Sequence, residues 1–201
     1  MKTTKQFIQL TLILILSGLS INGFAQFTAD MVFNNTGQEK QFKVYSAEAG
    51  YRYEFEERGN KSAIIVKNGS KDVVILMPDQ KMAIKSPAGS QMSMNNDPIK
   101  VFEKYEEQGI LKKEGNETIN GIVCTKSTLW SKKNPGQKMY TLWYSEKYKF
   151  PMKIIDHMEG SEGSSMEMKN VKYWKPDNSK FEIPNNYQVM SMPGMPDIPQ
   201  M

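Results

Sequence analysis

Residues 51–77 read YRYEFEERGNKSAIIVKNGSKDVVILM, and this stretch contains three successive strand patterns. Aromatic residues alternate with charged ones over 51–55, which is the two-residue period of a half-buried strand. Asn68-Gly69 then separates two apolar runs, and this pair tolerates the positive φ angles of a tight hairpin turn. The run 73–77 is apolar on both faces, so something besides the sheet must pack over it.

Similar patterns continue on both sides of this stretch. Phe27, Ala29, Met31 and Phe33 alternate with more polar residues, and short apolar segments recur between turn residues along most of the chain. About ten strands at such spacing predict a mainly β protein whose curved antiparallel sheet forms a closed barrel or a half-barrel. The further predicted strands cover 41–46, 63–67, 119–130, 138–145, 152–158, 165–174 and 181–184, and one more begins at Leu111.

One short helix is predicted over 97–109. Asp97 can cap its first turn, Pro98 suits the first helical position, and Gly109 can end it. Ile99 and Phe102 share one face of this helix. An amphipathic helix within a run of strands is a natural cover for the sheet.

The N-terminal segment 1–25 has the features of a signal peptide. Lys2 and Lys5 precede an apolar run over 8–19, and the small residues in 23–25 suit a signal peptidase. We therefore expect an exported protein, periplasmic or secreted, that does not span a membrane once this segment is removed.

The rest of the chain is long enough for one hydrophobic core. We expect a single domain over 26–189 and a disordered tail over 190–201, where Met and Pro are frequent. The net charge of +4 is far below the excess typical of nucleic-acid-binding proteins, so no nucleic-acid partner is expected.

No catalytic constellation is apparent. His157 is the chain's single histidine, and its neighbour Asp156 would point to the opposite face of a strand. Cys124 lies in an apolar segment where cysteine behaves as a small hydrophobic residue. We therefore predict a protein that is not an enzyme and that needs no cofactor.

Methionine is unusually frequent, with 15 in the chain. Thioethers are soft ligands that favour Cu(I), so Met92, Met94, Met190 and Met192 are an alternative metal site. The simpler interpretation is that methionine fills irregular apolar gaps.

The aromatic strand residues form the remaining signal. In a closed small barrel they fill the core, whereas in a wider, open barrel they line an apolar cavity that can hold an acyl chain. Periodicity alone does not decide between these two arrangements. With the predicted helix, the cavity candidates are Tyr51, Tyr53, Phe55, Ile99, Phe102, Trp130, Tyr140 and Trp143.

Five motifs together resemble an exported bacterial family of unknown function, the DUF 4412 type. That family is distantly similar to the periplasmic lipoprotein carriers of the LolA/LolB type. The resemblance implies an unclosed, curved antiparallel sheet, covered on its concave side by helix and loop, with a lipid-sized cavity between them. The motifs are FTADM at 27–31, NETING at 116–121 leading to CTK at 124–126, YTLWYS at 140–145, FPMK at 150–153 and FEIP at 181–184.

The resulting hypothesis is a non-enzymatic exported protein that binds a lipid, an acyl chain or another apolar small molecule. An envelope protein is a further expected partner. The alternatives are Cu(I) binding outside the cytoplasm and a ligand-free structural protein of the cell envelope.

Overall fold

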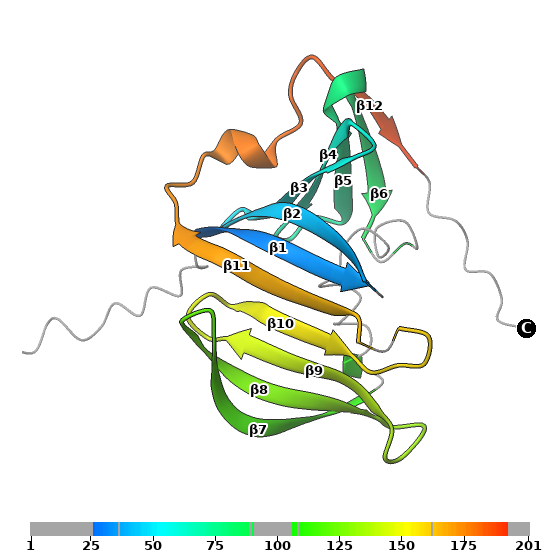
Figure 1. Cartoon of the computed structure of the whole chain (residues 1–201). Helices are drawn as coiled ribbons and strands as arrows, with labels where there is room; N and C mark the ends of the chain where they lie inside the picture. The colour runs from blue at the N-terminus through cyan, green and yellow to red at the C-terminus, as the bar shows by residue number, and fades with distance from the viewer. Residues whose placement is uncertain are drawn as a thin grey trace, which may run out of the picture.

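The computed structural model describes residues 26–35, 37–88, 90, 106–107, 109–161 and 163–192. Within these residues twelve strands form one curved sheet, in the order β12-β6-β5-β4-β3-β2-β1-β11-β10-β9-β8-β7 (Figure 1). The strands are β1 (Phe27–Asn35), β2 (Gln38–Ala47), β3 (Gly50–Glu57), β4 (Asn60–Lys67), β5 (Asp72–Met77), β6 (Met82–Pro87), β7 (Gly109–Ile119), β8 (Ile122–Ser131), β9 (Lys138–Ser145), β10 (Phe150–Asp156), β11 (Ser165–Tyr173) and β12 (Gln188–Ser191).

All neighbouring strands are antiparallel except β12, which pairs in parallel with β6. The order ends at β12 on one side and at β7 on the other, so the described sheet is not closed into a barrel. This confirms the predicted mainly β, unclosed architecture, with twelve strands in place of about ten.

Two strands were missed and one predicted strand is wrong. β6 has little alternation and ends in proline, while β12 buries none of its side chains, so neither leaves a clear periodic signal. In the predicted strand at 181–184, Phe181 instead ends the short 3₁₀ helix η2 (Asn178–Phe181), and residues 182–184 follow that helix outside the sheet.

The main hydrophobic core lies on the concave side of the sheet. It combines side chains from the first half of the chain, such as Phe27 and Tyr53, with side chains from the second half, such as Leu142 and Met168. These residues are close together because β1 pairs with β11 and thereby joins the two halves of the sheet.

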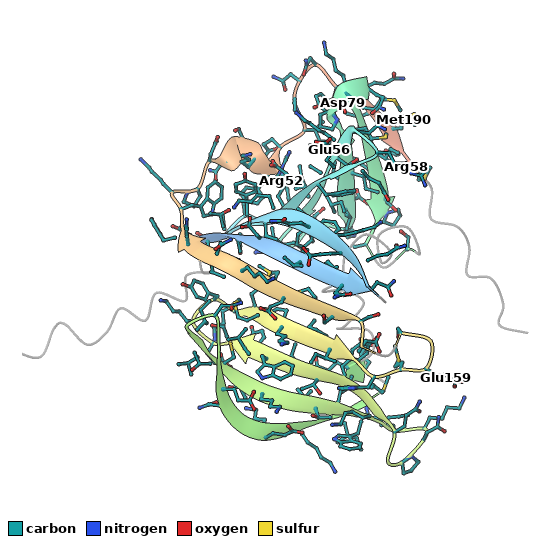
Figure 2. All side chains as sticks on the ribbon, viewed as in Figure 1. Arg52, Glu56, Arg58, Asp79, Glu159 and Met190 are labelled. Carbon is teal, nitrogen blue, oxygen red and sulfur yellow. The ribbon has the colours of Figure 1, made fainter. Side chains whose placement is uncertain are left out.

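A second core lies on the outer face of the first half. Segment 174–187 crosses this face, and Phe181 from η2 packs with Ile65 and Leu76. Arg52 fixes the segment by donating a hydrogen bond of 2.9 Å from Nη1 to the carbonyl oxygen of Lys180, and Figure 2 shows Arg52 beside the η2 ribbon. The run 73–77 is apolar on both faces, and segment 174–187 packs over the face of this run that does not point into the main core.

Several expectations fall partly or wholly outside the described residues. These are the signal peptide 1–25, most of the helix predicted over 97–109, and the tail from 193 onward. At the edges of those segments, Glu106 and Glu107 are helical, Gly109 begins β7, and Met190 and Ser191 belong to β12. The boundary of the expected tail at 190 is therefore wrong, because the exposed edge of β6 supplies backbone partners for these residues. None of the helices described is long and apolar enough to cross a bilayer.

Candidate ligand groove

A groove of about 680 Å³ opens at one end of the concave side. Its volume falls within the range of small-molecule sites, roughly 300–1,000 Å³. It lies at the ends of β1 and β10, on the right in Figure 1. The lining residues are Met31, Phe33, Asn34, Asn35, Gln38, Lys40, Phe42, Tyr53, Phe55, Glu57, Ile64, Tyr140, Ile154, Asp156, Gly160, Ser161, Ser164, Ser165 and Met166.

Aromatic rings form one wall of the groove. The ring centroids of Phe33 and Phe42 are 5.4 Å apart, and those of Phe42 and Phe55 are 5.0 Å apart. These rings come from β1, β2 and β3, and all three are only partly buried. The wall therefore presents apolar surface that a ligand can cover.

Strand register places the lining side chains on one face. Met31 pairs with Phe42, and Tyr53 pairs with Ile64, so these four residues share a face of the first half. In the second half Ile154 lies opposite Met166, and Tyr140 lies opposite Asp156. The groove is thus built from both halves of the sheet.

The mouth of the groove is polar. Asn34 and Asn35 end β1, Gln38 and Lys40 begin β2, and Glu57 ends β3, so all of them lie at the same edge of the sheet. Lys40 Nζ is 3.0 Å from Glu57 Oε1, and this hydrogen bond lowers the pKa of the Glu57 carboxyl. Serines of the turn between β10 and β11 complete the rim.

The opposite end of the concave side is closed by aromatic packing. The Phe27 ring contacts Tyr148 and Phe150 edge to face, with centroid distances of 5.4 Å in both cases. Tyr51 reaches Phe150 across the interior at 6.1 Å, although β3 and β10 are not neighbours in the sheet. Among the described residues, packed aromatic rings therefore occupy one end of the concave side, and the groove with its polar mouth occupies the other.

The structure brings together four of the eight predicted cavity residues on the concave side. Tyr53, Phe55 and Tyr140 line the groove itself, while Tyr51 belongs to the closed end. Ile99 and Phe102 lie outside the described residues.

Trp130 and Trp143 do not line the groove. In β9, Tyr140 lines it, whereas Trp143 is only 7% exposed and belongs to the main core, and its Nε1 donates a hydrogen bond of 2.7 Å to Glu117 Oε2. The Trp143 ring lies between Lys126 and Lys153, whose Nζ atoms are 5.4 and 5.5 Å from its centroid.

Trp130 lies in the same way between two lysines. The Nζ atoms of Lys112 and Lys138 are 5.7 and 5.6 Å from its ring centroid. Neither tryptophan is among the lining residues of the groove, and a ligand-contacting role for them stays a prediction.

The sequence interpretation also missed several lining residues. These residues have plain apolar side chains with no catalytic or metal-binding group. Only the pairing of adjacent strands, which puts Phe33 and Phe42 on the same face as Phe55, could have identified them. The missed apolar lining residues are Met31, Phe33, Phe42, Ile64, Ile154 and Met166.

The remaining candidate chemistry lies away from the groove. His157 Nε2 and Thr141 Oγ1 form a hydrogen bond of 2.8 Å, and Cys124 is buried, which raises the pKa of its thiol. In the part of the chain that the structure describes, no three His, Cys, Asp or Glu residues form a group that could hold a metal ion.

The methionines of the alternative Cu(I) site are not brought together by any described contact. Met190 and Met192 are exposed in and after β12 (Figure 2 labels Met190), while Met92 and Met94 lie outside the described residues. Met166 and Met168 are buried in the main core.

Comparisons with known proteins support the architecture. No family model and no curated protein matches the chain. An uncharacterized conserved protein from Thermus thermophilus is 15% identical with a TM-score of 0.57, and the match covers 84% of this chain and 91% of that one. The two chains therefore share a fold.

Two other solved structures are similar at a lower level. MucB in a Pseudomonas aeruginosa MucA/MucB complex is 12% identical with a TM-score of 0.45, covering 83% of this chain and 58% of that one. A LolA superfamily protein from Nitrosomonas europaea is 12% identical with a TM-score of 0.38, covering 79% and 90%. Both TM-scores are below 0.5, and this chain spans less than two thirds of the MucB chain.

Proposed function

We propose that this protein is an exported, non-enzymatic binding protein that holds a lipid, an acyl chain or another apolar ligand in the groove. The observation that carries this proposal is a space of about 680 Å³, walled by Phe33, Phe42 and Phe55, that the described side chains leave unfilled. A ligand pocket is typically concave and mostly apolar, with a few polar groups that fix orientation.

The energetics suit reversible holding. Burying about ten methylene groups at ~0.8 kcal/mol each gives roughly 8 kcal/mol before the entropic costs of binding are subtracted. This is enough for useful affinity without making release impossible.

The site of action follows from the N-terminal segment. The apolar run over 8–19 with its preceding lysines supports export, and the five motifs given above support assignment to the DUF 4412 type of exported bacterial family. Both assignments are part of the proposal. An apolar ligand in the envelope needs shelter from water, which this groove can provide.

The direct test is to express the full chain in a bacterial host, extract it without detergent, and analyse it by native mass spectrometry. We expect a co-purifying lipid or acyl compound, and saturable binding of a fluorescent fatty-alcohol probe after the ligand is removed. A protein that carries no ligand and ignores the probe would overturn the proposal.

A matched pair of variants ties binding to the groove. Gln38→Trp adds a large side chain at the mouth, and we expect it to weaken probe binding at least tenfold. Val123→Trp makes a comparable addition at a residue that is 66% exposed and outside the groove lining, so it should leave binding unchanged. Equal effects of both changes would place the probe elsewhere.

A further inference from the structure

We propose that the groove selects single-chain amphiphiles whose head group is neutral or positively charged, and discriminates against anionic ones such as fatty carboxylates. This inference rests on the proposed function and specifies the ligand class of the same site. It follows from the direction of polarity along the groove and from the charges that line its mouth.

The groove fixes the direction in which an amphiphile binds. Its polar lining residues gather at one edge of the sheet, where β1 ends and β2 begins. Its inner lining is apolar, with Met31, Tyr53 and Ile64 all buried. The tail therefore lies against these apolar residues and the head group lies at the polar mouth.

Three residues that carry a charge at pH 7 line the groove among the residues described: Lys40, Glu57 and Asp156. Lys40 and Glu57 form an ion pair at 3.0 Å, so their charges largely cancel. Asp156 has no ion-pair partner in the described part of the chain. The described lining therefore carries one uncompensated negative charge.

Asp156 is held firmly in this position. Its backbone N–H donates to Ser164 and its carbonyl oxygen accepts from the Gly163 N–H, at 2.8 and 3.2 Å. One carboxylate oxygen, Oδ1, accepts a hydrogen bond of 2.7 Å from the Met158 N–H. The other oxygen, Oδ2, has no hydrogen bond to the described residues and can accept one from a head group.

This arrangement favours one sign of charge. A carboxylate at the mouth would be repelled by Asp156 and would find Lys40, the lysine of the described lining, already paired with Glu57. A hydroxyl or ammonium head group could instead donate a hydrogen bond to Asp156. For a charge separation of about 6 Å across the water-filled mouth (ε ≈ 80), the repulsion of a carboxylate and the attraction of an ammonium together amount to about tenfold in affinity.

The test compares three ligands with the same tail length: dodecylammonium, monododecanoylglycerol and dodecanoate. Each displaces the apolar fluorophore Nile red from the full-length protein, at concentrations below micelle formation. At low salt we expect dodecylammonium to bind about tenfold, and monododecanoylglycerol about threefold, more tightly than dodecanoate, and both differences to shrink at high salt.

Asp156→Asn keeps the acceptor for Met158 but removes the charge, so it should bring the three affinities to within about twofold of each other. Glu56→Gln is the matched control, because it removes one charge from the outer face of β3, next to Glu57 (Figure 2 labels Glu56). The control should retain the tenfold preference. Equal denaturation midpoints for the variants and the parent verify that all of them fold.

The outcomes separate the two proposals. If all three amphiphiles bind equally well, or dodecanoate binds best, the head-group inference is overturned while the binding function stands. If Asp156→Asn leaves the preference intact, the assignment to Asp156 is overturned. If none of the three displaces the fluorophore, the proposed function itself fails.

Discussion

The closed end and the open end of the concave side are built from the same strands but are filled differently. At the start of β1 the Phe27 ring is fully buried and packs edge to face against Tyr148 and Phe150. At the end of β1 the Phe33 ring is only partly buried and borders the groove. The same alternation of apolar residues thus yields packed core at one end and accessible surface at the other.

The difference comes from what reaches across the interior. At the closed end, Tyr51 from β3 meets Phe150 from β10, so side chains from the two halves of the sheet touch. At the open end, the strand termini carry short polar residues, such as Asn34 near the end of β1 and Ser165 at the start of β11, which leave space between the walls. We infer that the closed end mainly supplies stability and the open end mainly supplies binding.

The largest expected effect follows from breaking the closed end. Phe27→Ala removes a fully buried ring with two aromatic partners, so the free energy of unfolding should fall by about 3–5 kcal/mol. Phe33→Ala at the open end should cost less than half as much, because that ring is partly exposed and already borders empty space. Urea denaturation of both variants measures this, and equal losses would contradict the division between the two ends.

A change at the open end should act on binding. Phe42→Ala removes the central ring of the aromatic wall, and we expect a roughly tenfold loss of affinity for an acyl probe, equivalent to about 1.4 kcal/mol. Trp143→Phe is the control, since it changes an aromatic residue that does not line the groove. Its affinity should match that of the unchanged protein, and a comparable loss would place the ligand outside the groove.

The strands were largely predictable because their side chains alternate between water and core. Residues 51–77 supply parts of three adjacent strands, β3, β4 and β5, as their pattern indicated. The unclosed sheet was not predictable from periodicity, which describes one strand at a time. It was anticipated from the family resemblance and is confirmed by the strand order.

The face that each aromatic residue occupies was less predictable. A single β-bulge or shift in strand register changes which residues share a face of the sheet. One such shift occurs in the pairing of β8 with β9, between Leu129 and Trp130. Only the pairing of the folded strands shows that Tyr140 points into the groove while Trp143 lies beside Lys153. Contacts across the interior, such as Tyr51 with Phe150, leave no local trace in the sequence either.

The smallest expected effect concerns the outer face at the open end, where His157 follows the groove residue Asp156. Burial lowers the pKa of His157 below its ordinary value of 6.5, Lys138 lowers it further, and Asp156 partly offsets both. The unfolded chain therefore takes up the proton at a higher pH than the folded one. The stabilisation is complete above about pH 6.5 and is lost as the pH falls through the pKa of the folded state.

His157→Gln should abolish this pH dependence, while the side-chain amide can still bond to Thr141. The measurement is the denaturation midpoint between about pH 5 and pH 8, a range above that in which carboxylates such as Glu54 and Glu167, whose pKa values are lowered, take up protons. Ligand affinity at pH 7 should not change, because His157 does not line the groove. A variant whose stability still falls over this range would show that another group titrates there, and a loss of affinity would show that the His157 side chain is coupled to the groove.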